Sequence, residues 1–236
     1  MRKVIITQWA LIVAIVLLTF FTDGRTKEFH KWTAGSQSGK VSFRGNLVTY
    51  SWLYHSFGLR TERLEFSINY RRGIDRMQEE YRKKNHTLYE GNGSDFIFKD
   101  PYSLDLCVIA GAIADVGNRY WLDRVEVALS FVQNLPFQEM GSYQRYAVET
   151  LIDGRGDCSD KSILFAGLLD VWDYDWVFLV FDEHLAIGIW RPCGLPGWRY
   201  FFMRRCYYYC ETSGEGWHVG DCPPEYEDVP CEIENP

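Results

Sequence analysis

The sequence predicts an α+β fold, in which helices pack against antiparallel sheet behind an N-terminal transmembrane helix. Aromatic and β-branched runs such as 48–54 and 64–70 are typical of strands. Apolar residues in 104–116, 123–133 and 158–169 predict helices with a buried face. With 236 residues, 47% of them hydrophobic and 17% aromatic, the chain can bury the core of one compact domain.

The N-terminal segment predicts a membrane anchor. Arg2 and Lys3 precede an apolar run from Val4 to Phe21, and about 17–25 such residues are needed to cross a bilayer. A cleaved signal peptide is the competing interpretation, but its apolar region is shorter and ends at small residues, which 20–24 lacks. A buried core helix is a third option that the basic flank disfavours. We therefore expect a retained single-pass anchor, with the bulk of the chain extracytoplasmic.

The charge of the chain limits its expected partners, and its modification motifs agree with an extracytoplasmic location. The net charge is −7 with no basic stripe, so nucleic acid is not an expected partner. Two sequons, at Asn85 and Asn92, lie in a polar stretch that predicts an exposed loop. The last residues hold several carboxylates and no Lys or Arg, which indicates a solvated tail.

These observations divide the chain into five regions. A spacer follows the anchor, a strand and helix region with an exposed helix at 73–84 comes next, and the core precedes the acidic tail. The predicted bounds are 1–22 for the cytoplasmic tip and anchor, 23–40 for the spacer, 41–119 for the N-terminal strand and helix region, 120–222 for the core and 223–236 for the tail.

Seven cysteines suggest disulfide bonds in an oxidising compartment. Four of them lie within 193–222. The alternative is a zinc site, but Cys206 and Cys210 lie in a strand-like run rather than a knuckle turn, so we favour disulfides. That site would use Cys206, Cys210 and Cys222, with His218 or Cys231 as fourth ligand.

Several other residues are assigned to the core. The stripe Val125, Leu129 and Val132 has helical spacing, and Cys107 is expected to be a small core residue. The tryptophans expected in the core or in a cleft wall are Trp121, Trp172, Trp176 and Trp190.

The segment 146–169 carries the candidate nucleophile. Gly154 and Gly156 permit a tight turn, and Asp157 is well placed to cap a helix that begins at Cys158. The positive end of the helix dipole and the free N–H groups there favour a thiolate. Cys158 is therefore a candidate nucleophile.

A candidate base and acid follow Cys158 in the chain. The strand 176–181 leads through a turn to His184 and a second strand, and the strand-like run 200–210 ends at Glu211. This order is that of a thiol–imidazole–carboxylate site, in which the acid holds the imidazole in the required tautomer. His218 is the alternative base.

The run from Glu149 through Gly156-Asp157-Cys158-Ser159-Asp160-Lys161, together with His184 and the later block Glu211-Thr212…Gly216-Trp217, resembles the transglutaminase-like superfamily. It is similar in particular to membrane-anchored members from archaea. The resemblance spans about residues 120–220 and implies a papain-related core, in which the nucleophile helix packs on an antiparallel sheet. It implies Cys158 as nucleophile, His184 as base and Glu211 as orienting acid. The superfamily more often has Asp as the third member, so Asp221 is the alternative.

The expected reaction is acyl transfer at an amide or isopeptide bond through a Cys158 thioester, with no cofactor and no metal. We favour peptidase-like hydrolysis over cross-linking, and we expect envelope protein or wall peptide as substrate. The alternative is a catalytically inert transglutaminase-like module that binds peptide or glycan at the envelope. A thiol oxidoreductase is disfavoured because the chain has no C-x-x-C motif.

Overall fold

A computed structural model describes residues 39–44, 47–56, 60–69, 95–98, 103–139 and 144–236. The chain divides into two compact units, Met1–Thr33 and Ala34–Pro236, the first of which lies outside the described residues. The predicted anchor, both sequons and the predicted helix 73–84 also lie outside them. No helix in the described ranges is long and apolar enough to span a membrane.

The first sheet is an antiparallel meander of β1 (Lys40–Arg44), β2 (Leu47–Ser56) and β3 (Arg60–Asn69). Alternate side chains of β2 are buried, as the two-residue period of a strand requires when one face is covered. Tyr50 and Trp52 of this strand lie with their ring centroids 5.4 and 5.2 Å from that of Phe131 on a neighbouring helix. The first sheet is therefore joined to the helices through aromatic contacts.

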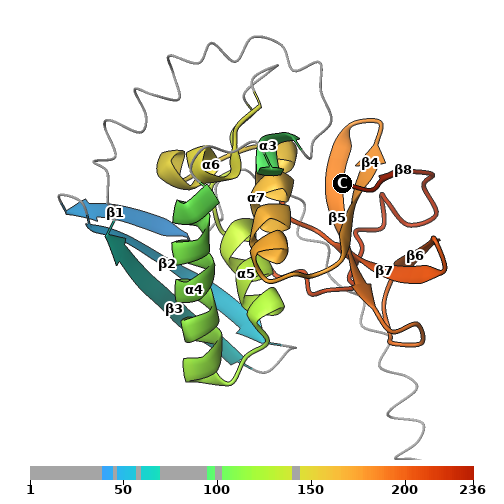
Figure 1. Cartoon of the computed structure of the whole chain (residues 1–236). Coiled ribbons are helices and arrows are strands. Elements are labelled where there is room, and N and C mark those ends of the chain that lie inside the picture. Colours follow the sequence, from blue (N-terminus) through green and yellow to red (C-terminus); the bar gives the residue numbers. More distant parts are fainter. Residues whose placement is uncertain (1–38, 45–46, 57–59, 70–94, 99–102, 140–143) are drawn as a thin grey trace, which may run out of the picture. The chain divides into compact units, whose positions relative to one another are not determined.

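The helices are α3 (Asp95–Phe98), α4 (Ser103–Tyr120), α5 (Arg124–Gln133), α6 (Ala147–Asp153) and α7 (Cys158–Val171). Helix α4 contacts β3 and α5 contacts β2, whereas α7 contacts β4 and β5 of the second sheet. Since α7 also contacts α4, α5 and α6, the helices form a layer between the sheets (Figure 1). The mixed α+β class predicted from the sequence is confirmed.

The expectation that Cys107 is a core residue is wrong. Cys107 lies on the exposed face of α4, because the buried positions of this helix recur at helical spacing elsewhere. Trp121 is also exposed, with 94% of its surface accessible, and Trp190 is partly so, whereas Trp176 is buried as expected. The buried α4 residues are Leu106, Ile109, Ala110, Ile113 and Val116.

The second sheet is antiparallel with the strand order β6-β7-β5-β4-β8. The run 200–210, expected as one strand, is a hairpin, because Met203 and Arg204 adopt left-handed φ values of 46° and 64° and reverse the chain. The segment expected as a solvated tail contributes β8, which pairs with β4. The strands are β4 (Trp176–Phe181), β5 (His184–Arg191), β6 (Arg199–Phe202), β7 (Arg205–Cys210) and β8 (Glu232–Glu234).

One disulfide bond joins Cys193 to Cys206. This pair agrees with the disulfide prediction and removes Cys206 from the alternative zinc site. In the described part of the chain, no group of three or more His, Cys, Asp or Glu residues is arranged to hold a metal ion.

Candidate active site

The turn between α6 and α7 sets the position of Cys158. Helix α6 ends at Gly154, whose φ of 63° is left-handed and favours glycine. A side chain at Gly156 would lie 2.6 Å from the Cβ of Asp160, so this position accepts only glycine. Asp157 accepts a hydrogen bond from the Asp160 backbone N–H, and α7 begins at Cys158. Both glycines and the predicted cap therefore act to place the thiol in the first turn of α7.

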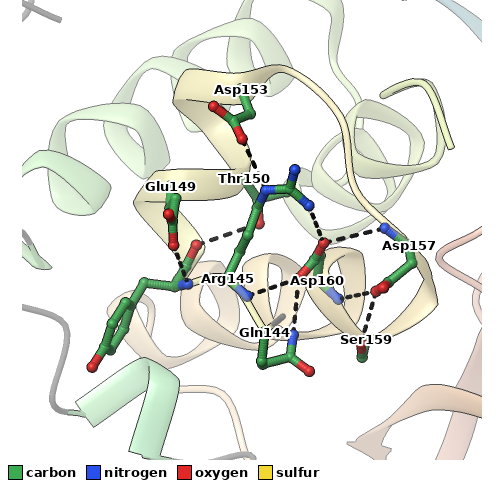
Figure 2. A network of polar contacts seen from close by, with 9 residues as sticks. Gln144, Arg145, Glu149, Thr150, Asp153, Asp157, Ser159 and Asp160 are labelled. Atoms are coloured by element: carbon green, nitrogen blue, oxygen red, sulfur yellow. Dashed lines mark hydrogen bonds and ion pairs between the residues drawn. The ribbon is translucent and has the colours of Figure 1, made fainter. Parts of the chain in front are cut away.

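A buried network of hydrogen bonds and ion pairs around Arg145 and Asp160 holds this turn in place (Figure 2). Arg145 donates to Asp160 at 2.6 Å and to Asp153 at 2.9 Å, and its backbone N–H donates to Asp160 at 2.9 Å. Gln144 and the Asp157 backbone N–H also donate to Asp160. Burial raises the pKa of Asp160 to about 6, with Asp157 adding to the rise and Arg145 opposing it. Asp160 thus connects the segment before α6 to the start of α7.

His184 and Glu211 are brought together by the second sheet. Ile187 of β5 pairs with Cys210 of β7, so antiparallel pairing carries Glu211 back toward His184 at the start of β5. His184 Nε2 lies 3.0 Å from Glu211 Oε2, and both side chains are buried. The sequence-predicted pairing of imidazole and acid is present in the fold.

The charge of the pair favours a protonated imidazole. Burial lowers the pKa of His184, but the charge of Glu211 and hydrogen bonds with Cys158 and Glu211 outweigh it, so the pKa rises to about 10. Burial raises the pKa of Glu211, but the charge of His184 and the hydrogen bonds from His184, Ser213 and Tyr209 outweigh this effect. The pKa of Glu211 is therefore below its usual value. Since Nε2 faces Glu211, Nδ1 remains for the thiol of Cys158. Cys158 is a half-buried free thiol, so a substrate carbonyl can approach it.

The carboxylate is fixed by further contacts that the sequence did not reveal. Tyr209 donates its hydroxyl to Glu211 Oε2 at 2.8 Å, and the Ser213 N–H donates to Oε1 at 2.7 Å. Gln133 at the end of α5 donates its amide to the carbonyls of Glu211 and Trp217, at 2.7 and 2.8 Å. These hydrogen bonds therefore fix both the Glu211 carboxylate and the backbone that follows β7.

Lys161, one helical turn after Cys158, also fixes the backbone that follows β7. Its side chain is fully buried, and Nζ donates to the carbonyls of Gln133 and Ser213, at 3.1 and 3.3 Å. Burial lowers the pKa of Lys161 to about 7, with Glu211 the strongest opposing charge. A lysine among the apolar residues of the predicted α7 was the only sequence signal of this contact.

Aromatic rings form one wall of the site. Tyr226 stacks on the His184 imidazole, with the centroids 4.5 Å apart and the planes inclined by 14°. Phe181 lies 5.0 Å from the Tyr226 ring. Burial raises the pKa of Tyr226 to about 12, with further contributions that include Glu211 and Cys158. Tyr226 was missed because it lies in the stretch whose acidic composition indicated solvent exposure.

The alternative base and acid lie in other contacts. His218 Nδ1 is 3.0 Å from Glu126 Oε2 on α5. Asp221 accepts the His218 backbone N–H at 3.1 Å, within a local turn. The geometry therefore joins His184 to Glu211 rather than to Asp221.

None of the protein-family models, curated proteins or solved structures compared with the chain matches it significantly. The catalytic roles of Cys158, His184 and Glu211 consequently stay a prediction, supported by their geometry and by the chemistry of thiol, imidazole and carboxylate groups.

Proposed function

We propose that the chain is a thiol enzyme with a transglutaminase-like core, which cleaves amide or isopeptide bonds through a Cys158 thioester. The observation that carries this proposal is the 3.0 Å contact of Glu211 with the buried His184 imidazole at the start of strand β5, which packs against the helix that bears Cys158. A buried imidazole held between a thiol and a carboxylate is the arrangement that activates a cysteine nucleophile. A core helix that bears the thiol and packs on antiparallel strands is consistent with that superfamily.

The proposed reaction begins with a thiolate–imidazolium pair. The Cys158 sulfur attacks the amide carbonyl, and the C–N bond breaks as His184 gives its proton to the departing amine. Water then attacks the thioester, His184 accepts a proton from it, and the acid and free thiol are released. The Cys158 backbone N–H, in the first turn of α7, is the candidate donor to the oxyanion.

Hydrolysis remains the favoured outcome because water reaches a half-buried thiol without a dedicated acceptor pocket. An extracytoplasmic, membrane-anchored location rests on the N-terminal apolar run, and it makes envelope protein or wall peptide the proposed substrate.

The test is incubation of the chain with a mixed peptide pool in ¹⁸O-labelled water, with and without a primary amine. New peptide termini carrying ¹⁸O indicate hydrolysis, and amine incorporation indicates transfer. Cys158→Ala is the control, and both products should vanish in it. If the wild type and Cys158→Ala give the same products, the enzyme proposal fails and the inert binding module takes its place.

A further inference from the structure

The β6–β7 hairpin and the loop before it form an exposed surface of apolar and cationic side chains. We define the hairpin surface as Leu195, Arg199, Phe201, Met203 and Arg204, all of which are exposed. The exposed fractions of Phe201 and Met203 are 71% and 69%. Large apolar side chains that are grouped on one exposed surface, rather than scattered singly, often mark a surface that binds a partner.

The backbone keeps these residues on one side and at the tip. Arg199 and Phe201 alternate along β6 and share a face, and Arg199 donates to the Leu195 carbonyl. Phe201 pairs with Cys206, whose disulfide to Cys193 ties the preceding loop to the same face. The hairpin surface is therefore a fixed feature of the fold rather than a chance exposure of separate residues.

The turn retains large side chains where the backbone disfavours them. Met203 and Arg204 both have left-handed φ values, positions for which two-residue hairpins prefer Asn and Gly. Backbone strain held at an exposed site is a reason to look for a function of the side chains there.

Charge identifies the kind of partner. The whole chain carries a net charge of −7, yet residues 185–210 contain four arginines and no Asp, Glu or Lys. Arg191 and Arg205 pair with Asp123 and Asp175, respectively. In the described part of the chain, Arg199 and Arg204 form no ion pair, so the hairpin surface keeps its positive charge.

We propose that the hairpin surface docks on an anionic lipid bilayer, with Phe201 and Met203 entering the interface and Arg199 and Arg204 meeting the headgroups. Apolar side chains beside arginines bind such surfaces by combining burial with attraction to anionic lipid. The inference is independent of the proposed catalysis, since it uses none of the active-site residues.

The test measures depth at single positions of the full chain reconstituted into vesicles. An environment-sensitive fluorescent amino acid replaces Leu195, which is 45% exposed, in one preparation and the control Trp121, which is 94% exposed, in another. Vesicles are made of phosphatidylcholine alone or with one third phosphatidylglycerol, and with brominated acyl chains as quencher. We expect quenching of at least about twofold at position 195 in the anionic vesicles, weakened by salt, and none at position 121.

Two variants and one matched control separate docking from folding. Arg204→Glu should abolish the quenching at position 195, whereas the matched variant Arg119→Glu on α4 should leave it unchanged. Met203→Asn combined with Arg204→Gly suits the turn better, so it should raise the Tm by a few degrees while the quenching disappears. If the probe at position 195 is quenched no more than the probe at position 121, the proposal is overturned. A signal that depends on protein concentration and not on lipid would also overturn it, because such a signal would indicate a second copy of the chain.

Discussion

Replacement of Glu211 by Gln removes the charge that keeps His184 protonated while preserving the shape of the side chain. The pKa of His184 is raised from 6.5 to about 10, with Glu211 the largest of the causes that raise it. At about 1.4 kcal/mol per pKa unit, the full shift corresponds to at most about 5 kcal/mol. Breaking one partner of a buried ion pair costs about 3–5 kcal/mol, so we expect Glu211→Gln to lose about 3–5 kcal/mol of stability near pH 7.

The sign of the pH dependence follows from the direction of the shift. Because the folded pKa of His184 is raised, its stabilisation is complete below pH 6.5 and is lost as the pH rises through about 10. Between pH 8 and 9.5 the difference in the free energy of unfolding between the wild type and Glu211→Gln should therefore shrink, by up to about 1.4 kcal/mol per pH unit. Lys161, whose pKa is lowered to about 7, is neutral in both folded proteins there, so its contribution cancels.

The assay is urea unfolding of the compact unit 34–236 at half-unit pH steps, with the wild type and Glu211→Gln in parallel. Parallel stability curves across pH 8–9.5 would refute the reasoning, because they would mean that His184 gains no proton affinity from Glu211.

Three further substitutions test the supports of the site and the disulfide. Between pH 7 and 10.5 the free energy of unfolding of Lys161→Met, measured by urea unfolding, should fall relative to that of the wild type, because the lowered pKa of the buried lysine gives the wild type a contribution that rises with pH. Gln133→Leu leaves the bonded backbone groups near Glu211 without partners at about 1–3 kcal/mol each, so thermal unfolding should occur earlier and thiol alkylation should slow. Cys193→Ser removes the disulfide that closes a loop of sequence separation 13, so the free energy of unfolding measured with denaturant should fall by about 3 kcal/mol. Adding reductant should leave the unfolding midpoint of this variant unchanged.

The elements that the sequence predicts well are those with local signals. Helix α7 begins at Cys158 because Asp157 caps it, and this signal is visible in the chain itself. The turn at Met203 and Arg204 was missed because it carries none of the Gly or Asn residues that mark such turns. Local patterns thus locate an element reliably only when the residues that end it have the usual chemistry.

The support of the candidate site depends on partners distant in the chain. Gln133 and Tyr226 reach Glu211 and His184 across 78 and 42 positions, and neither has a local pattern that predicts it. Lys161 is a polar residue inside a helix. Its side chain can be buried only because α5 and the loop after β7 supply the carbonyl groups that accept its hydrogen bonds. Burial of a polar side chain is a property of tertiary packing, so a single sequence rarely reveals it.

The most direct test of the central claim is the alkylation of Cys158 by iodoacetamide, resolved by peptide mass spectrometry from pH 4 to 9. Cys107, an exposed thiol on α4, is the reference in the same chain, and Glu126→Gln, which removes the partner of His218, is the matched control.

An ordinary thiol with a pKa near 8.5 is less than about 1% ionised at pH 6. We therefore expect Cys158 to react at least about tenfold faster than Cys107 at that pH, and His184→Ala but not Glu126→Gln to remove the difference. Equal rates for the two thiols, or a Cys158 rate that does not change in His184→Ala, would contradict the thiolate–imidazole pair and with it the proposed enzyme.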